Sequence, residues 1–346
     1  MAKILIITLE YPPEIGGIAT YVSEQFLSFP ADAAVVLQPT LSRWFYPRWL
    51  GIIFTVWRAV NQSSITEIYI HHALPIGYVG LVLNIGKKIP YTIFFHGADI
   101  TSKKSTTRWK RFCLRLVVAR AESLVVNSLA MKQRLVDWLM VKADKIQLVY
   151  PKVNKDFFTV PDQNLITKTK DHYALPGKKV VLAVARLSEG KGLPLLIRYF
   201  PAVLQKVPNA ILLIAGDGEK RNFLLNLISE LNLQNCVRLV GALPRGELRS
   251  LYACADVFAL LTHTDEVRGI EAFGLVFAEA GASGLPVVAG ETGGVSEVVQ
   301  NEKTGFVVVA QQKNSVVEKI CQLLLDPVLA KQMGEAGREF VRKNFS

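Results

Sequence analysis

Short apolar runs alternate with amphipathic segments of helical length along this chain, and the alternation occurs in two series. The first series has strand-like runs at Ile4–Leu9, Ala34–Leu37, Glu67–His72, Tyr91–Phe95, Ser123–Asn127 and Lys145–Val149. The second has them at Val180–Arg186, Ala210–Ala215, Cys236–Val240, Asp256–Leu260, Pro286–Ala289 and Gly305–Val309. Short buried strands that alternate with helices predict parallel sheets covered by helices. We therefore expect an α/β protein with two doubly wound domains.

The alternation breaks at Pro151, and a polar stretch without sustained periodicity follows it. A chain of 346 residues also exceeds the size of a single hydrophobic core. We expect an N-terminal domain over 1–155, a linker over 156–171 and a C-terminal domain over 172–346. Two such domains in tandem would place the carboxyl ends of their strands across a cleft, where open α/β sheets bind ligands.

The cysteines and the apolar segments indicate the cellular compartment. Cys113, Cys236, Cys254 and Cys321 are scattered, with no CxxC pair and no histidine at ligand spacing, which is typical of a reduced chain. The opening MAKILIITLEYPP lacks a small-residue cleavage site, so it predicts a buried first strand and not a signal peptide. No uncharged apolar stretch approaches the roughly 20 residues that span a bilayer. We expect a cytoplasmic protein, soluble or peripheral on the inner face of the cell membrane.

Positive charge is concentrated in the first half of the chain. Residues 1–160 carry 19 Lys and Arg against 10 Asp and Glu, and the remaining residues carry 21 against 19. The run RWFYPRWLGIIFTVWR over 43–58 holds three of the five tryptophans, and TRWKRFCLRLVVAR over 107–120 predicts a basic amphipathic helix. Tryptophan and arginine on an apolar face favour an anionic membrane surface, although both helices could instead pack on the sheet and expose their cations. No nucleic-acid partner is expected, because no recognised binding motif accompanies the charge.

Two cations follow the strand-like VVLAVAR in the second half. Arg186 ends this strand, and Lys191 precedes the helix-like GLPLLIRYF. Cations beside a helix N-terminus predict a diphosphate site, and they would stabilise negative charge on a departing nucleoside diphosphate. Taken alone, the two residues could equally belong to a solvated surface loop.

Two glutamates lie eight residues apart in EAFGLVFAE. A predicted helix begins at Phe273-Gly274-Leu275, so free backbone amides near Gly274 could meet phosphate or sugar oxygens. Glu279 could accept hydrogen bonds from a ribose diol, and Glu271 could meet the sugar or the leaving group. Glutamate pairs at this spacing are common in helices, so the pair indicates a ligand site only together with the residues around it.

The first half contributes glycines and histidines at strand ends. Gly16 and Gly17 follow the first strand, where glycine permits backbone contact with a phosphate, although an ordinary strand–helix turn uses the same residues. His96 ends the strand-like YTIFF and should emerge at the cleft, but a lone histidine is more often structural. His71 and His72 also end a strand, and we expect one of them to face the cleft and the other to pack.

The combined motifs resemble one enzyme family. EAFGLVFAEAGASGLPVVAGETGGVSEVV is similar to the donor-site signature of family 4 retaining glycosyltransferases, which have the GT-B fold. The similarity extends to YPPEIGGIATYV, FFHGADI, VYPKVNKDFF, ARLSEGKGLPLLI, IAGDGE and LVGALP, and so to nearly the whole chain. YPPEIGG and TDEVRGIEAFG are most similar to bacterial phosphatidylinositol mannoside mannosyltransferases. The resemblance implies two Rossmann-like domains that face a cleft, with the acceptor on the N-terminal side and the nucleotide sugar on the C-terminal domain.

The resemblance also implies a role for each candidate residue. Arg186 and Lys191 match the pair that binds the donor diphosphate. Glu279 matches the ribose ligand, Glu271 matches the glutamate near the transferred sugar, and His96 matches the histidine that contacts that sugar. The remaining matches are to backbone contacts with the donor, at Gly16, Gly17, Leu243, Phe273, Gly274 and Leu275.

Some features depart from the family pattern or exclude other chemistry. The usual EGFG is EAFG here, a small-for-small change, and the stretch between Leu261 and Glu271 is longer and more charged than common versions. No Asp-x-Asp triplet and no other metal-ligand spacing occurs, so we expect Arg186 and Lys191 to neutralise charge without a metal or a cofactor. IAGDGE is not the dinucleotide fingerprint, which disfavours a dehydrogenase.

We therefore expect an enzyme that moves a hexose, with mannose as one candidate, from a nucleoside-diphosphate sugar to a lipid-linked or membrane-proximal saccharide acceptor. Two alternatives stay open. One is another GT-B enzyme, such as a sugar-nucleotide epimerase or a soluble sugar-phosphate glycosyltransferase. The other is a non-catalytic sugar-nucleotide-binding protein.

Overall fold

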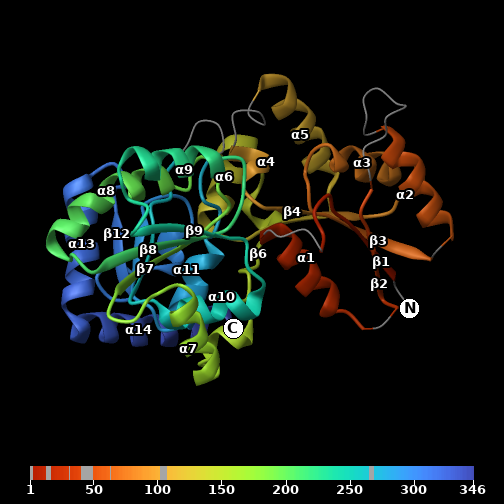
Figure 1. The fold of residues 1–346 in the computed structure, drawn as a ribbon. Coiled ribbons are helices and arrows are strands. Elements are labelled where there is room, and N and C mark those ends of the chain that lie inside the picture. The colour runs from red at the N-terminus through yellow and green to blue at the C-terminus, as the bar shows by residue number, and fades with distance from the viewer. Residues whose placement is uncertain are drawn as a thin grey trace. The chain divides into compact units, whose positions relative to one another are not determined.

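The computed structural model describes residues 3–12, 17–30, 32–39, 50–62, 64–101, 107–264 and 269–346. The chain divides into two compact units, Met1–Tyr150 and Pro151–Ser346. Each unit contains a parallel six-stranded sheet with flanking helices (Figure 1). The predicted α/β class with two doubly wound sheets is confirmed.

The sheet of the first unit has the strand order β2-β1-β3-β4-β5-β6. Its strands are β1 (Lys3–Ile7), β2 (Ala34–Leu37), β3 (Ile65–Ile70), β4 (Tyr91–Phe95), β5 (Ser123–Val126) and β6 (Ile146–Leu148). Its helices are α1 (Gly17–Leu27), α2 (Leu50–Gln62), α3 (Ile76–Lys87), α4 (Ala98–Thr101), α5 (Arg108–Arg120) and α6 (Leu129–Leu139), followed by the 3-10 turn η1 (Ala143–Lys145). Every predicted strand of this half is present. β4 is buried at all five positions, as expected for a strand covered by helices on both faces of the sheet.

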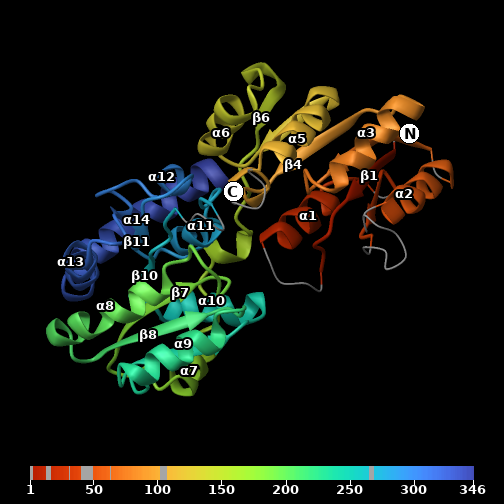
Figure 2. The same ribbon diagram turned by 90° about the horizontal axis from the view of Figure 1, so that it is seen from above.

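Three helices of the first unit lie side by side. α3 packs against both α2 and α5, and Figure 2 shows the three helices in succession. The inward side of α5 buries Cys113, Leu114, Val117 and Val118. The predicted amphipathic helix over 107–120 is confirmed, and Thr107 caps its N-terminus by accepting a hydrogen bond from the backbone N–H of Lys110.

The sheet of the second unit has the order β12-β11-β10-β7-β8-β9. Its strands are β7 (Lys179–Val184), β8 (Ala210–Ala215), β9 (Val237–Gly241), β10 (Val257–Leu260), β11 (Val287–Gly290) and β12 (Gly305–Val308). Its helices are α7 (Gln163–His172), α8 (Leu193–Lys206), α9 (Arg221–Glu230), α10 (Arg245–Cys254), α11 (Leu275–Ala282), α12 (Val295–Val298), α13 (Lys313–Leu325) and α14 (Pro327–Phe345), and the 3-10 turn η2 (Lys155–Phe158) precedes α7. The six predicted strands of this half are also present.

The segment 156–171, assigned to a linker from the sequence, contains most of α7. The carboxylate of Asp162 caps this helix by accepting from the N–H of Asn164 at 2.8 Å. Ile166 is the single buried residue of α7, so the helix lacks the apolar periodicity by which helices are recognised. α7 packs against α10 and thus belongs to the second unit.

The C-terminal helix α14 supports α11. The two helices lie alongside each other (Figure 2), and Gly281 and Gly337 form the close approach, since a Cβ on Gly337 would lie 3.5 Å from the Cα of Gly281. Arg338 donates from Nε to the carbonyl of Ala282 at 3.1 Å and from Nη2 to that of Ser283 at 2.9 Å. These bonds satisfy carbonyls at the C-terminus of α11. Within the described ranges, no helix has the length and apolar character needed to cross a bilayer.

Candidate functional site

The site begins with an ion pair between two loops of the second unit. Arg186 lies two residues beyond β7 and is exposed, and Lys191 lies further along the same loop. The ammonium of Lys191 pairs with the carboxylate of Glu271, in the segment between β10 and α11. The two side chains are 29% and 16% exposed, so the pair is half-buried. The structure therefore brings together a cation and an anion that the sequence placed in one site.

A glycine permits the loop after β7 to approach the end of β10. Gly192 has φ 68°, and a Cβ there would lie 1.8 Å from the carbonyl oxygen of Leu261. The same two segments are joined where His263 donates its backbone N–H to the carbonyl of Gly190 at 3.0 Å. A side chain at position 192 would separate these loops, so glycine is required for their contact.

A second glycine fixes the backbone of Glu271. Gly293 follows β11 with φ 50°, and a Cβ on it would lie 1.9 Å from the carbonyl oxygen of Glu271. Gly294 donates its N–H to that same carbonyl at 3.1 Å. The backbone that carries the Glu271 carboxylate is therefore held by the loop after β11.

The N-terminus of α11 presents free backbone amides next to this pair. Gly274 is the N-cap residue, with φ 83°, and no side chain caps the helix. The amides of Leu275 and Val276 come before the first intrahelical bond, so they can bind an anion together with the positive end of the helix dipole. The side chain of Phe273 is buried and packs edge-on against Phe345, with ring centroids 5.2 Å apart. Its backbone is thus the part of Phe273 suited to a ligand, as predicted for this stretch.

Glu279 lies one turn further along α11 and has a buried tyrosine as a partner. The hydroxyl of Tyr252 lies 3.2 Å from Oε2 of Glu279 and 3.4 Å from the carbonyl oxygen of Val276, and can donate to either. Burial, reinforced by the carboxylate, raises the pKa of Tyr252 well above its ordinary value. Tyr252 was not predicted from the sequence, because a tyrosine on the buried side of an amphipathic helix has the same pattern as any core residue.

Leu243 lies in the loop between β9 and α10, at the edge of a hollow of about 350 Å³. The other lining residues come from α7, the residue after it, and the first turn of α10, namely Lys168, Thr169, His172, Tyr173 and Glu247. Leu243, a predicted donor contact, therefore borders a cavity.

Histidines gather at the carboxyl ends of β3 and β4 in the first unit. Nδ1 of His71 lies 3.1 Å from Nε2 of His96, and their rings are stacked with centroids 5.3 Å apart. His71 is fully buried, whereas His96 and His72 are partly exposed. Gly17 begins α1 in the same unit, and Gly16 lies outside the described residues.

Asp99 joins the loops that carry these histidines. Its carboxylate accepts from the backbone N–H of Ala73 at 3.3 Å and from that of His96 at 3.4 Å. Burial raises the pKa of Asp99 to about 6, against the lowering effect of these hydrogen bonds. Asp99 was not predicted from the sequence, although its position three residues after His96 is the spacing of a side chain that caps a turn.

The histidine rings are uncharged at neutral pH. Burial lowers the pKa of His96 to about 3 and that of His72 to about 4. Burial also lowers the pKa of His71 well below its ordinary value, and the two neighbouring histidines add to this effect. Hydrogen bonds from these rings are therefore those of neutral imidazoles.

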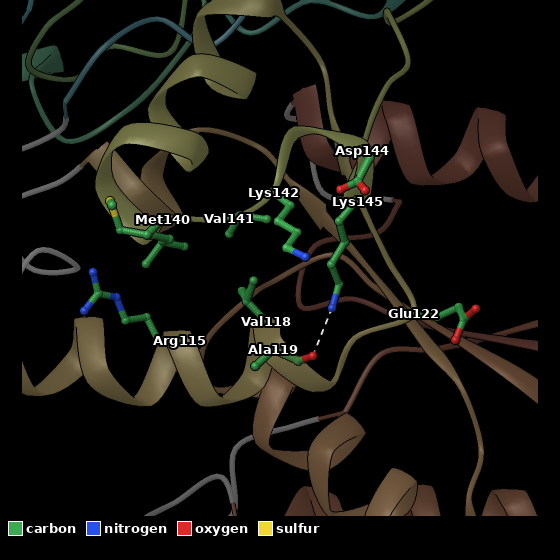
Figure 3. Close-up of a pocket in the computed structure, with 10 residues that line it drawn as sticks. Arg115, Val118, Ala119, Glu122, Met140, Val141, Lys142, Asp144 and Lys145 are labelled. Carbon is green, nitrogen blue, oxygen red and sulfur yellow. Dashed lines mark hydrogen bonds between the residues drawn. The ribbon is translucent and has the colours of Figure 1, made fainter.

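A separate hollow of about 600 Å³ lies in the first unit between the C-terminal ends of α5 and α6 (Figure 3). Lys145 donates from Nζ to the carbonyl of Ala119 at 3.0 Å across this hollow. Lys142 also reaches inward, whereas Glu122 points away (Figure 3). None of the predicted site residues lines it.

Two family models match the chain. Residues 4–157 match "Glycosyltransferase Family 4", and residues 166–340 match "Glycosyl transferases group 1". The GDP-mannose-dependent alpha-(1-6)-phosphatidylinositol monomannoside mannosyltransferase of Mycolicibacterium smegmatis is 27% identical, over 99% of this chain and 94% of the relative. The N-acetyl-alpha-D-glucosaminyl L-malate synthase of Bacillus anthracis is also 27% identical, over 87% of this chain and 76% of the relative.

Solved structures of glycosyltransferases share the fold. Anabaena HepE in complex with UDP-glucose superposes with a TM-score of 0.83 at 20% identity, over 100% of this chain and 96% of that one. The sucrose-phosphate synthase of Thermosynechococcus elongatus gives a TM-score of 0.82 at 21% identity, over 100% and 95%. The family models that match the two halves, the fold and the relatives that span the chain all indicate the same family. The protein therefore belongs to the family 4 (group 1) glycosyltransferases of GT-B fold.

Proposed function

We propose that this glycosyltransferase moves a mannosyl group from GDP-mannose to a lipid-linked saccharide acceptor, with retention of anomeric configuration. The observation that carries the donor half of the proposal is the Lys191–Glu271 pair beside the uncapped N-terminus of α11. The mannosyl donor and the lipid acceptor are suggested by the name of the Mycolicibacterium relative, which aligns with 99% of this chain.

The proposed reaction uses the residues of the second unit as a fixed electrostatic site. The donor diphosphate lies against Arg186, Lys191 and the first amides of α11, and Glu279 accepts from the ribose hydroxyls. The bond between the sugar and the diphosphate breaks as charge accumulates on the leaving phosphate, where the cations and the helix amides stabilise it. The acceptor hydroxyl attacks from the face that the diphosphate leaves and gives its proton to a phosphate oxygen. Glu271 orients the sugar.

We propose that this chemistry proceeds without a metal ion. Two fixed cations and a helix N-terminus supply the charge neutralisation that a divalent cation supplies in other phosphate chemistry. In the described part of the chain, no three His, Cys, Asp or Glu side chains gather as a metal site would require. The direct test is turnover in the presence of a chelator, which should leave the rate unchanged.

The donor site is tested by replacing Lys191 and Arg186 with alanine. Transfer of labelled mannose from GDP-mannose should fall by about 100-fold or more in each variant, because a charge-assisted contact to the leaving group is lost. Arg198→Ala is the matched control, since this exposed arginine of α8 takes no part in the proposed site. Undiminished transfer by both variants would refute the assignment, and analysis of product anomers tests retention.

The lipid-linked acceptor implies contact with a membrane, and one surface of the first unit is suited to it. We define the outer α2–α3–α5 face by its exposed apolar residues, which are Phe54, Trp57, Val82, Ile85, Trp109, Phe112 and Leu116. Trp109 is 71% exposed and lies beside Phe112, with ring centroids 5.9 Å apart. The opposite side of α5 is buried, so this helix has apolar residues on two sides. A helix that only packs on a sheet needs apolar residues on its buried side alone.

The charge around this face favours an anionic bilayer. Helices α2, α3 and α5 contain no acidic residue, and α5 alone carries Arg108, Lys110, Arg111, Arg115 and Arg120. Lys87 of α3 lies 5.1 Å from the ring centroid of Trp57 on α2, so cations and aromatic rings share the surface. Peripheral membrane proteins typically insert aromatic residues into the membrane–water interface beside cationic residues. We propose that the enzyme works at the cytoplasmic face of the cell membrane.

Flotation with liposomes tests this surface. Vesicles containing phosphatidylglycerol should carry the protein upward, whereas phosphatidylcholine vesicles should carry much less. The double variant Trp109→Ser/Phe112→Ser should lose most of the binding. Leu325→Ser/Val328→Ser is the matched control, because these apolar residues of the second unit are 61% and 65% exposed but lie outside this face. Equal flotation of wild type and the double variant would contradict the proposal.

A further inference from the structure

The contact between His71 and His96 joins a buried ring to a partly exposed one. Nδ1 of His71 is 3.1 Å from Nε2 of His96. The other nitrogen of His71, Nε2, is buried and has no hydrogen-bond partner among the residues that the structure describes. The His71 ring is held in place by Phe94, stacked on it at 4.5 Å with an interplanar angle of 14°.

A hydrogen bond between two neutral imidazoles contains one proton, so one ring donates and the other accepts. If His96 donated, the proton of His71 would sit on Nε2 and leave a buried N–H without an acceptor. If His71 donates from Nδ1, its Nε2 keeps only an unused lone pair. Buried N–H groups without acceptors are rarer in proteins than acceptors with unused lone pairs. The second arrangement is therefore favoured.

We infer that His71 is a positioning residue that holds His96 in the tautomer with its proton on Nδ1, so that His96 offers an N–H donor to a substrate oxygen. The inference rests on the proposed function and on the contact between His96 and the donor sugar that the family resemblance implies. A hydroxyl or phosphate oxygen is the matching ligand chemistry, because an Nδ1 that carries a proton cannot accept one. His96 thus acts as a hydrogen-bond donor and not as a general base.

The groups around the pair are compatible with this assignment. The carboxylate of Asp99 is engaged by backbone N–H groups, including that of His96, and so fixes the main chain under the ring. Leu9 donates its backbone N–H to Nδ1 of His72 at 3.3 Å, which gives His72 a separate partner. Tyr21 packs edge-on against His96 with centroids 5.4 Å apart, and restrains the ring from the side.

The test is two-bond ¹H–¹⁵N correlation spectroscopy of protein labelled with ¹⁵N-histidine, with the His96 signal assigned through His96→Gln. The wild type should show His96 protonated on Nδ1. In His71→Asn a side-chain amide can still donate from near the position of Nδ1, so this tautomer should persist. In His71→Leu, which is similar in size but has no donor, the tautomer protonated on Nε2 should gain population.

Activity provides the second readout. We expect kcat/KM for GDP-mannose to fall about tenfold or more in His71→Leu, the effect of one lost neutral hydrogen bond, and His71→Asn to recover part of it. A wild-type His96 protonated on Nε2, or a His71→Leu variant with an unchanged His96 tautomer, would overturn the inference. Full activity in His96→Gln would instead refute the sugar-contacting role while leaving the tautomer assignment intact. If His71→Leu does not fold, the wild-type and His71→Asn spectra still decide the question.

Discussion

Lys191 forms an ion pair with Glu271, which lies four residues before α11 begins. A diphosphate that binds at this position therefore competes with Glu271 for the ammonium of Lys191. The carboxylate keeps the cation in place before the ligand arrives and opposes the ligand once it is bound. The contribution of Glu271 to diphosphate affinity can therefore be measured separately from its contribution to turnover.

Glu271→Gln should strengthen the binding of GDP and weaken catalysis. Removing the carboxylate frees Lys191 and takes a negative charge away from the diphosphate, so Kd should fall by about three- to tenfold, equivalent to roughly 1 kcal/mol at a half-exposed site. Turnover should fall because the sugar loses its orienting group. Isothermal titration with GDP measures the first effect, and Glu230→Gln, an exposed residue of α9, is the control. Weaker GDP binding by Glu271→Gln would contradict this explanation.

Tyr252→Phe should raise KM for the nucleotide sugar while changing kcat little. The hydroxyl of Tyr252 lies 3.2 Å from the carboxylate of Glu279, and its loss leaves that carboxylate less well oriented toward a ribose. A binding contact present equally in the ground and transition states affects KM more than kcat. The ring stacked on Phe258 is retained, so steady-state kinetics should show a rise in KM of about three- to tenfold. A fall in kcat at constant KM would instead assign Tyr252 to the chemical step.

Arg338→Met should destabilise the second unit. The substitution keeps the length of the side chain but removes two hydrogen bonds to the carbonyls of Ala282 and Ser283 at the end of α11. Hydrogen bonds from charged groups contribute about 1.5–3 kcal/mol each, so urea denaturation should show a loss of about 2 kcal/mol or more. Lys343→Met, an exposed position of the same helix, should stay within about 0.5 kcal/mol of wild type. Equal stability of the two variants would show that α14 holds α11 by apolar packing alone.

The histidine cluster should make the first unit less stable in mild acid. The folded-state pKa of His72 is about 4, below that of the unfolded chain, so between about pH 6.5 and 4 the unfolded state binds a proton that the folded state does not. His72 alone should then lower the free energy of unfolding by about 1 kcal/mol per pH unit as the pH falls. Asp99 acts in the opposite direction, since its raised pKa of about 6 lets the folded state bind a proton first.

Thermal unfolding of wild type and His72→Gln at pH 7.5 and pH 5.5 measures the effect of His72. On acidification the melting temperature of the wild type should fall more than that of the variant. The difference should correspond to about 1 kcal/mol in the free energy of unfolding. Any fixed effect of the substitution on packing is common to both pH values and cancels in the comparison. Parallel shifts in the two proteins would mean that His72 is protonated in the folded state.

The architecture was predictable because buried parallel strands have a direct sequence signature. β8 is buried at all six positions, and its residues Ala210–Ala215 are all apolar. α7 was missed for the opposite reason, since Ile166 is its single buried side chain and its other apolar residue, Leu165, is exposed. Its N-cap, Asp162, is a local signal that could have revealed it.

The candidate site was predictable where its proposed chemistry depends on charged residues near strand ends. Lys191 and Glu271 are of this kind, and the structure pairs them. Tyr252 and His71 were not identified as partners of the site, because each is buried and its role depends on a contact across the fold. Such contacts depend on packing between elements distant in the sequence, to which no local pattern corresponds.

The glycine contacts in the loops after β7 and β11 determine how the proposed donor site can respond to a ligand. Gly192 and Gly293 place their backbones directly against the carbonyls of Leu261 and Glu271, with no side chain between them. Loops packed in this way have little conformational entropy left to lose. Binding energy from the nucleotide is then not consumed in ordering the protein, and more of it remains to stabilise the transition state.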